Sequence, residues 1–224
     1  MGSSGKKNIS KSCLPLLTIL SILLPLSAWT NSTDETFLPE DPFPDKESSS
    51  FAMVQQADWK LVLAGEVGTF PARRAVVVRF MPNGSIDRDF GENGIFRLPT
   101  PSGSVFHDIK ITGDKSFIAV GAVSEKERHS KIVVCRFTRD GSLDKSFGED
   151  GITLFRGKGL RAEVALTCDI QKDGKIVIVG WHSVGDNHGM AMRMLRLQKN
   201  GDFDREFGDN GVITFSNKAY PSVY

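Results

Sequence analysis

The sequence lacks the motifs that would point directly to a catalytic site. It contains no glycine-rich phosphate loop, no HExxH motif, no GxSxG motif and no CxxC pair. It also lacks a one-sided charge, because 28 lysines and arginines balance 27 aspartates and glutamates, whereas a nucleic-acid-binding domain usually carries a clustered basic charge. These absences favour a protein that is not an enzyme and has no nucleic-acid partner.

Cysteine is scarce, and only Cys135 and Cys168 lie beyond the first 28 residues. Both occur in apolar, strand-like runs, KIVVCRF and ALTCDI, so we expect two buried free thiols. A disulfide between them is the alternative, because an oxidising compartment would permit one.

The apolar run Cys13–Ala28 is shorter than the roughly 20 residues that a membrane-spanning helix needs. Lys6, Lys7 and Lys11 precede it, no acidic residue does, and it ends in Leu26-Ser27-Ala28. This order is typical of a secretory signal peptide. We therefore predict a cleaved signal over residues 1–28 of a secreted, periplasmic or cell-surface bacterial protein, with an uncleaved membrane anchor as the alternative.

Residues 29–50 have the composition of an acidic linker rich in proline and serine. The stretch Thr30–Ser50 holds six acidic residues, one lysine and three prolines, and it ends in three serines. A segment of this kind buries too little apolar surface to fold alone. We expect it to be extended and solvated, with the folded part of the chain starting at Phe51.

Glycine is plentiful, with 22 copies, and much of it lies in a phrase that occurs three times. We call this phrase the corner: it is NGSIDRDFGENGI at residues 83–95, DGSLDKSFGEDGI at 140–152 and NGDFDREFGDNGV at 200–212. The copies lie 57 and 60 residues apart, a period typical of propellers and other repeat arrays. Residues 51–224 are therefore divided into three repeats, at about 51–100, 101–157 and 158–219.

Each repeat contains four strand-like segments separated by polar turns. In the second repeat these are FHDIKIT, SFIAVGAV, KIVVCRF and GITLFRG. Short strands joined by turns predict an antiparallel sheet, and near-continuous apolar runs predict strands covered on both faces. The expected fold class is all-β: three tandem four-stranded antiparallel blades, β-propeller-like, either open or completed by oligomerisation.

The corner has the residues of a structural joint. Asn-Gly or Asp-Gly supplies positive φ where the third strand ends, and the aspartate three residues later can bond nearby backbone amides. The phenylalanine would fill an apolar gap, and a repeated arginine (Arg79, Arg136, Arg196) can pair with such an acid. A calcium site is less favoured because the spacing is not that of an EF-hand, and a copied ligand loop is less favoured because a binding site is usually asymmetric. The joint residues are Gly84, Asp87, Phe90, Gly91, Gly141, Asp144, Phe147, Gly148, Gly201, Asp204, Phe207 and Gly208.

These residues carry a family resemblance. The pattern VQxDGKIxxxG, followed after a third strand by RxxxDGSLDxSFGxxG, resembles the bacterial delta-60 repeat family over roughly residues 51–224. The resemblance implies a β-propeller-like, often exported protein, and it brings no catalytic residues. Trp59 in the first repeat and the GDKS turn in the second depart from the pattern.

The number of repeats is smaller than a propeller usually has, since propellers close with about four to eight blades. The last residues, PSVY, align with GSVF at the start of the second repeat, so we expect the chain to end where an absent fourth repeat would begin. Three interpretations stay open: copies that assemble into a ring, an open arc with protected ends, and a truncated, non-functional fragment of a longer repeat protein.

The segment between the second and third strands differs in every repeat. Equivalent loops of a propeller gather on one edge, and variable loops on a rigid scaffold commonly carry binding. We therefore predict a non-enzymatic module that binds a protein or glycan through these loops; a propeller hydrolase or lyase acting on sugars or lactones is the alternative. The candidate binding residues are Phe70, Arg73, Arg74, Glu125, Arg128, His129, Trp181, His182, Asp186 and His188.

Two further patterns are given structural interpretations. The histidines of WHSVGDNHGM fit no standard ligand spacing, so we expect no metal and no cofactor there. Met190, Met192 and Met194 alternate along a strand, and we expect them to pack in the core.

Overall fold

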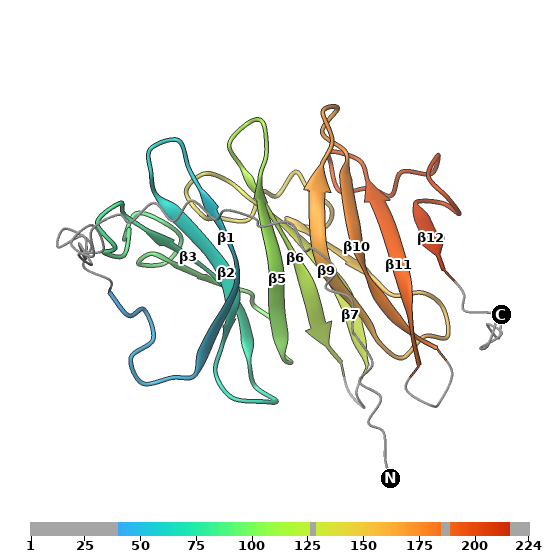
Figure 1. The fold of residues 1–224 in the computed structure, drawn as a ribbon, viewed down its shortest axis with the longest axis horizontal. Coiled ribbons are helices and arrows are strands. Elements are labelled where there is room, and N and C mark those ends of the chain that lie inside the picture. Colours follow the sequence, from blue (N-terminus) through green and yellow to red (C-terminus); the bar gives the residue numbers. More distant parts are fainter. Residues whose placement is uncertain (1–39, 126–128, 185–188, 216–224) are drawn as a thin grey trace, which may run out of the picture. The chain divides into compact units, whose positions relative to one another are not determined.

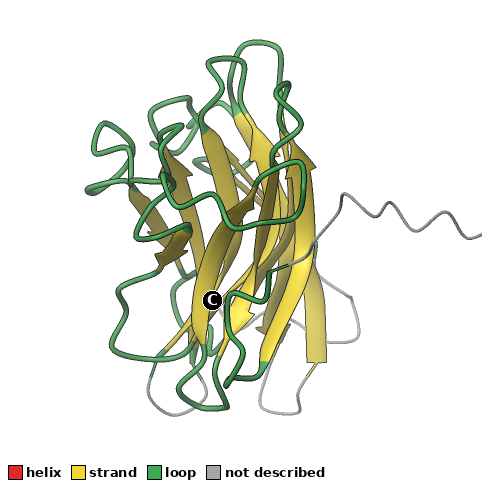
Figure 2. Cartoon of the chain, turned by 90° about the vertical axis from the view of Figure 1, so that its left-hand side faces the viewer, coloured by secondary structure: helices red, strands yellow, loops and turns green. Residues whose placement is uncertain are grey.

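The computed structural model describes residues 40–125, 129–184 and 189–215, and within these residues it contains strands and no helices (Figure 1, Figure 2). The predicted signal peptide (1–28) and residues 29–39 of the predicted linker lie outside them. Twelve strands form three sheets, which we call the first, second and third blades. The strands are β1 Ser48–Gln55, β2 Leu61–Val67, β3 Arg74–Phe80, β4 Ile95–Arg97, β5 Ser104–Ile111, β6 Phe117–Ser124, β7 Ser130–Phe137, β8 Ile152–Phe155, β9 Glu163–Ile170, β10 Ile176–Val184, β11 Gly189–Leu197 and β12 Val212–Thr214.

Every blade is an antiparallel meander whose strands follow each other in the chain. The sheet orders are β1-β2-β3-β4, β5-β6-β7-β8 and β9-β10-β11-β12. The all-β prediction of three tandem four-stranded blades is confirmed. The repeat period predicted this topology because each repeat folds into one complete sheet.

The apolar cores lie between consecutive blades. One cluster contains Phe90 of the first repeat and Phe106 of the second, and another contains Phe147 of the second and Ile178 of the third. Strand β6 contributes to both clusters through its two faces, and all of its residues except Ser124 are buried. This double coverage explains why its sequence, FIAVGAVS, is apolar almost throughout.

The two cysteines are buried free thiols, as the sequence predicted. Cys135 belongs to the cluster between the first and second blades, and Cys168 to the cluster between the second and third. Burial, followed by the charge of Asp108, raises the pKa of Cys168 to about 12. Because the thiolate is the reactive form, such a thiol is chemically inert at neutral pH.

Residues 40–50 differ from the predicted solvated linker. Strand β1 begins at Ser48, and its first residues pair with the end of β2 at Val67. Phe43 is 7% exposed and packs with Val67, Val76 and Val78 on the face of the first blade that points away from the second. Composition missed this contact because one aromatic side chain is enough to anchor an otherwise acidic segment to an apolar sheet face.

Each blade has a glycine in its second strand beside a β-bulge in its first strand. The register of the first strand shifts by one residue next to Gly65, Gly121 and Gly180. A Cβ on Gly121 would lie 1.9 Å from the carbonyl oxygen of Val105, and the other two glycines have a backbone oxygen at the same distance. The bulged strand therefore approaches so closely that the second strand has no room for a side chain there.

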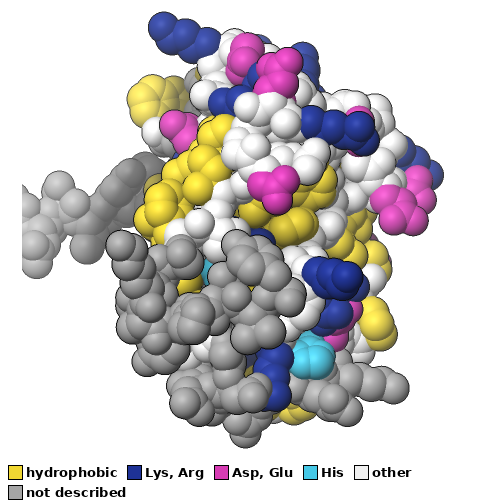
Figure 3. All heavy atoms as spheres, turned by 90° about the vertical axis from the view of Figure 1, so that its right-hand side faces the viewer, with side chains coloured by type: hydrophobic (Ala, Val, Ile, Leu, Met, Phe, Trp, Pro, Cys, Tyr) yellow, Lys and Arg dark blue, Asp and Glu magenta, His cyan; other side chains and the backbone are white. Residues whose placement is uncertain are grey.

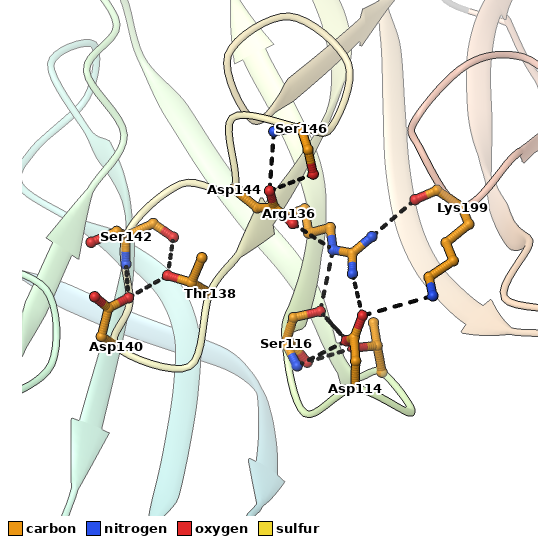
Figure 4. A network of polar contacts seen from close by, with 10 residues as sticks. Asp114, Ser116, Arg136, Thr138, Asp140, Ser142, Asp144, Ser146 and Lys199 are labelled. Atoms are coloured by element: carbon orange, nitrogen blue, oxygen red, sulfur yellow. Dashed lines mark hydrogen bonds and ion pairs between the residues drawn. The ribbon is translucent and has the colours of Figure 1, made fainter.

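The corner is held by a recurring arginine–aspartate pair. In the second blade, Arg136 Nε lies 3.1 Å from Asp144 Oδ2, and Arg136 Nη2 lies 2.5 Å from Asp114 (Figure 4). The other oxygen of Asp144 accepts the Ser146 backbone N–H at 3.0 Å, which closes the local turn. The predicted pairing of the repeated arginine with a corner acid is confirmed. The equivalent pairs are Arg79–Asp87 at 2.7 Å and Arg196–Asp204 at 2.6 Å.

The corner also binds the next blade. Gly91 N–H donates to the Asp140 carbonyl, and Arg79 Nη1 donates to the Arg139 carbonyl, both at 2.6 Å. The Phe90 ring is fully buried, and a Cβ on the glycine after Asp140 would lie 2.8 Å from it. The corner phrase therefore recurs because it joins blade to blade. The same contacts join the second blade to the third through Gly148, Arg136, Phe147, Lys199, Asn200 and Gly201.

Acid will weaken the corner, and Asp87→Asn will remove part of that effect. Burial raises the pKa of Asp87, but the hydrogen bond from Lys60 and the charge of Arg79 outweigh it and hold the pKa below the ordinary 3.8. Because the folded-state pKa is depressed, the stability that ionised Asp87 contributes is present above the unfolded-state pKa and is lost as pH falls through the folded-state pKa.

Urea unfolding between about pH 6 and pH 2 tests this expectation. D87N should be less stable than the wild type at the upper pH and should lose less unfolding free energy on acidification. D58N is the control, because Asp58 is an exposed acid of the same blade, and it should follow the wild type. Equal acid losses in D87N and the wild type would contradict the role assigned to Asp87.

Candidate functional site

The loops that differ between repeats lie along one edge of the blades, which we call the rim. Figure 1 shows β2–β3 turning at the lower edge and the β1–β2, β5–β6 and β9–β10 turns at the upper edge. Ser124 N–H donates to the β4–β5 crossover at 2.7 Å, and Ser130 and Ser183 N–H donate to the β8–β9 crossover at 3.0 and 2.8 Å. The crossovers between blades thus hold the described loop ends together.

The predicted binding residues of the first blade lie on the rim. Phe70 is 80% exposed. Arg73 Nη1 pairs with Glu66 at 2.6 Å, and Arg74 donates to the backbone carbonyls of the rim, including that of Ser102. Phe70 is therefore presented to solvent, whereas Arg73 and Arg74 are engaged within the rim itself.

Only two of the predicted residues of the β6–β7 loop are described. Glu125 pairs with Lys131 at 2.6 Å and also with Arg156 of the β8–β9 crossover. His129 lines a cleft that the crossover forms. Arg128, Asp186 and His188 lie outside the described residues, so their place on the rim stays a prediction.

Trp181 and His182 lie in a strand, and the prediction that they share a loop surface is wrong. Strand β10 extends to Val184 because its pairing with β11 continues as far as Gly189. His182 is only 5% exposed, on the face toward the second blade, while Trp181 lies on the opposite face and is half-buried.

His182 belongs to a buried polar cluster with Glu163 and Arg193, which we call the triad. Glu163 is 0% exposed and lies directly opposite His182 in the β9–β10 pairing. Arg193 Nη1 lies 3.1 Å from Glu163 Oε1, and Gly157 N–H donates to Glu163 Oε2 at 2.7 Å. Among the described residues, His182 Nε2 and Arg193 Nε have no hydrogen-bond partner.

Burial dominates the acid–base properties of the triad. It raises the pKa of Glu163, although the neighbouring charge of Arg193 acts in the opposite direction. Burial also lowers the pKa of His182, and the charge of Arg193 lowers it further. The result is a carboxyl group and an imidazole whose neutral forms are both favoured.

The triad replaces apolar and small residues of the other blades. Arg193 lies opposite the second-strand glycine, in the position that valine holds in the first two blades. The triad is therefore not needed to build a blade, and charged groups at such positions mark a candidate functional site. Aligning the repeats on that glycine would have revealed it from sequence. The equivalent residues are Val76 and Val133 for Arg193, Val67 and Val123 for His182, and Ser48 and Ser104 for Glu163.

A cleft of about 850 Å³ opens on the rim beside the triad. It is lined by His129 and by residues 156–161 of the β8–β9 crossover. Gly157 connects the two features, because it lines the cleft and also donates to Glu163. Arg156, Lys158 and Arg161 give the lining a positive charge that suits an anionic group.

The described residues show neither a metal-binding cluster nor a membrane-spanning helix. In residues 40–125, 129–184 and 189–215, no three His, Cys, Asp or Glu side chains form a group that could hold a metal ion. No helix in that part of the chain has the length and apolar character needed to span a membrane.

The family comparison agrees with the repeats seen in the structure. Residues 56–90 and 171–207 match the family described as a domain of unknown function (DUF5122) beta-propeller. These segments run from the turn after the first strand to the corner phenylalanine in the first and third repeats. A search of curated proteins found no match. The match is consistent with the predicted delta-60-like repeats, and these two segments of the chain are similar to the DUF5122 beta-propeller family.

Proposed function

We propose that this chain is an exported, non-catalytic β-propeller-like scaffold that binds a ligand, a glycan or a protein, at the rim beside the triad. The observation that carries the proposal is a difference between the repeats. The corners recur in all three repeats, and the first two of them join one blade to the next, whereas the triad and the basic cleft occur in the third repeat and its crossover.

The chemistry of the cleft favours an anionic ligand. Lys158 is exposed and has no ion pair among the described residues, and Arg156 pairs with Glu125, which also lies on the rim. Among glycans, those with uronate or sulfate groups fit this lining best.

A glycan array that contrasts acidic with neutral glycans tests the proposal. The wild type should bind acidic glycans, and Lys158→Glu should weaken that binding by about tenfold or more through charge reversal. Lys145→Glu is the matched control, because Lys145 is an exposed lysine of a corner, and it should bind like the wild type. If Lys158→Glu binds acidic glycans as tightly as the wild type does, the cleft is not the binding site.

An enzyme is the second candidate, and the triad is the observation that favours it. Neighbouring acid and base groups with shifted pKa values are common at catalytic sites. Glu163 is fully buried beneath Gly157, so a substrate would need the crossover to move. Turnover of sugars or lactones that His182→Asn abolishes, with the fold intact, would establish this alternative.

A further inference from the structure

The third corner has the same joint residues as the first two, but among the described residues it contacts no following blade. Among the described residues, no acceptor lies within hydrogen-bond reach of Gly208 N–H, and Arg196 pairs with Asp204 without reaching a carbonyl of another blade. Phe207 is partly exposed, whereas its counterparts Phe90 and Phe147 are fully buried. The donors that join one blade to the next are thus present and unused at this end.

The sheet face beside this corner carries exposed apolar side chains and is not covered by another described strand, and we call it the trailing face. Met190 is 66% exposed and Met192 is 47% exposed, and Figure 3 shows hydrophobic side chains gathered on this side. The expectation that these methionines pack in the core is wrong for this reason. In the second blade the position of Met192 is held by Ile132, which the third blade covers to 1% exposure.

The opposite face of the array, which we call the leading face, belongs to the first blade and is covered differently. Residues 40–43 form a cap on it: Glu40 N–H donates to the Gly84 carbonyl at 3.1 Å, and Phe43 packs on the sheet. The equivalent carbonyl of Gly201 accepts a hydrogen bond from Thr153 of the preceding blade at 2.9 Å. The cap therefore holds a position that a preceding blade would hold.

We propose that the trailing face of the third blade binds the leading face of the first blade in a second copy of this chain, and that residues 40–43 compete with it for that face. The polarity of the joint selects this arrangement. The trailing corner offers N–H and guanidinium donors, so a second trailing face would bring donors against donors. The turn Pro82-Asn83-Gly84 of the leading face offers carbonyls equivalent to those of Arg139-Asp140 and Lys199-Asn200, which accept the corner donors in the two internal joints.

The contact is head-to-tail, so it generates a ring or a filament according to its rotation angle. It extends a joint that the chain already forms twice within itself, between the first and second blades and between the second and third. It is independent of the rim, because the residues involved lie on the sheet faces and at the corners.

Light scattering after size exclusion, over a series of concentrations, tests the proposal on the whole chain. Loosening the cap with Glu40→Ala and Phe43→Ser should lower the concentration at which copies associate by about tenfold or more. Adding Met192→Glu should reverse that association, while Leu154→Glu, which places the same charge at an exposed leucine of β8, should leave it unchanged.

The outcomes are decisive in both directions. Association that becomes stronger when the cap is loosened, and that Met192→Glu reverses, supports the proposal. A folded cap variant that stays monomeric at every concentration overturns it, and so does association that Met192→Glu leaves intact. Glu40→Ala alone is the milder variant, for use if the double variant misfolds. It removes only the side-chain contacts to Arg88 and to Ile86 N–H. It should still lower the concentration at which copies associate.

Discussion

Replacing Gly121 with alanine is expected to lower the unfolding free energy by about 3 kcal/mol or more, which is among the larger effects of a single methyl group. The added Cβ would lie 1.9 Å from the Val105 carbonyl oxygen, and the obstacle is backbone, which cannot rotate away. The bulge in β5 would have to open, and the pairing of β5 with β6 would be lost around it.

Urea unfolding of Gly121→Ala beside Gly113→Ala measures this effect. Gly113 lies in the β5–β6 turn of the same blade, and a Cβ there would meet nothing within 4 Å. The control should stay within about 0.5 kcal/mol of the wild type. Similar stabilities for the two variants would show that the close approach at the bulge is relieved at little cost.

Replacing Arg193 with valine is expected to cost about 3 kcal/mol at a pH where Glu163 is ionised. The variant leaves a fully buried carboxylate without its cation, and burial already raises the pKa of Glu163. A carboxyl whose folded-state pKa is raised favours the fold below that pKa, and this contribution is lost as pH rises through it. Arg193→Val should therefore be more destabilising near pH 8 than near pH 5.

A triple variant separates the missing charge from the missing volume. Glu163→Ser, His182→Val and Arg193→Val together give the third blade the residues that the second blade has at these positions. This variant should be more stable near pH 8 than Arg193→Val alone, and its pH dependence should be flatter. If the triple variant is the less stable of the two, the triad makes a net favourable contribution to the free energy of unfolding and does not destabilise the scaffold.

The sequence predicted the parts of the fold that depend on contacts within one repeat. The arginine–aspartate pair of the corner could be predicted because Arg79 and Asp87 are only eight residues apart and recur as a pair in each repeat. The triad was missed because Glu163 and Arg193 meet only through strand register, which places both beside His182 across three strands. Trp181 and His182 were placed in a loop because the polar residues that follow them suggested that the strand ends earlier than it does. Strand β10 in fact continues to Val184.

The errors at the two ends of the array have a common physical cause. Alternation along β11 predicted burial for Met192, but alternation says which face a side chain is on and nothing about what covers that face. The acidic composition around Phe43 predicted solvation, yet an apolar sheet face was available for it. Coverage of an outer face is a property of neighbouring blades, so no pattern within one repeat encodes it.

The donor-to-carbonyl contacts at the corners give the array a direction, since each blade is completed by the one that follows it. Cooperativity in such a one-dimensional array is transmitted between nearest neighbours. The second blade has neighbours on both faces and is the part whose opening requires disruption of both clusters. Among the described residues, the third blade is the one whose corner makes no contact with a following blade, so we expect fraying to begin there. The triad lies on that blade.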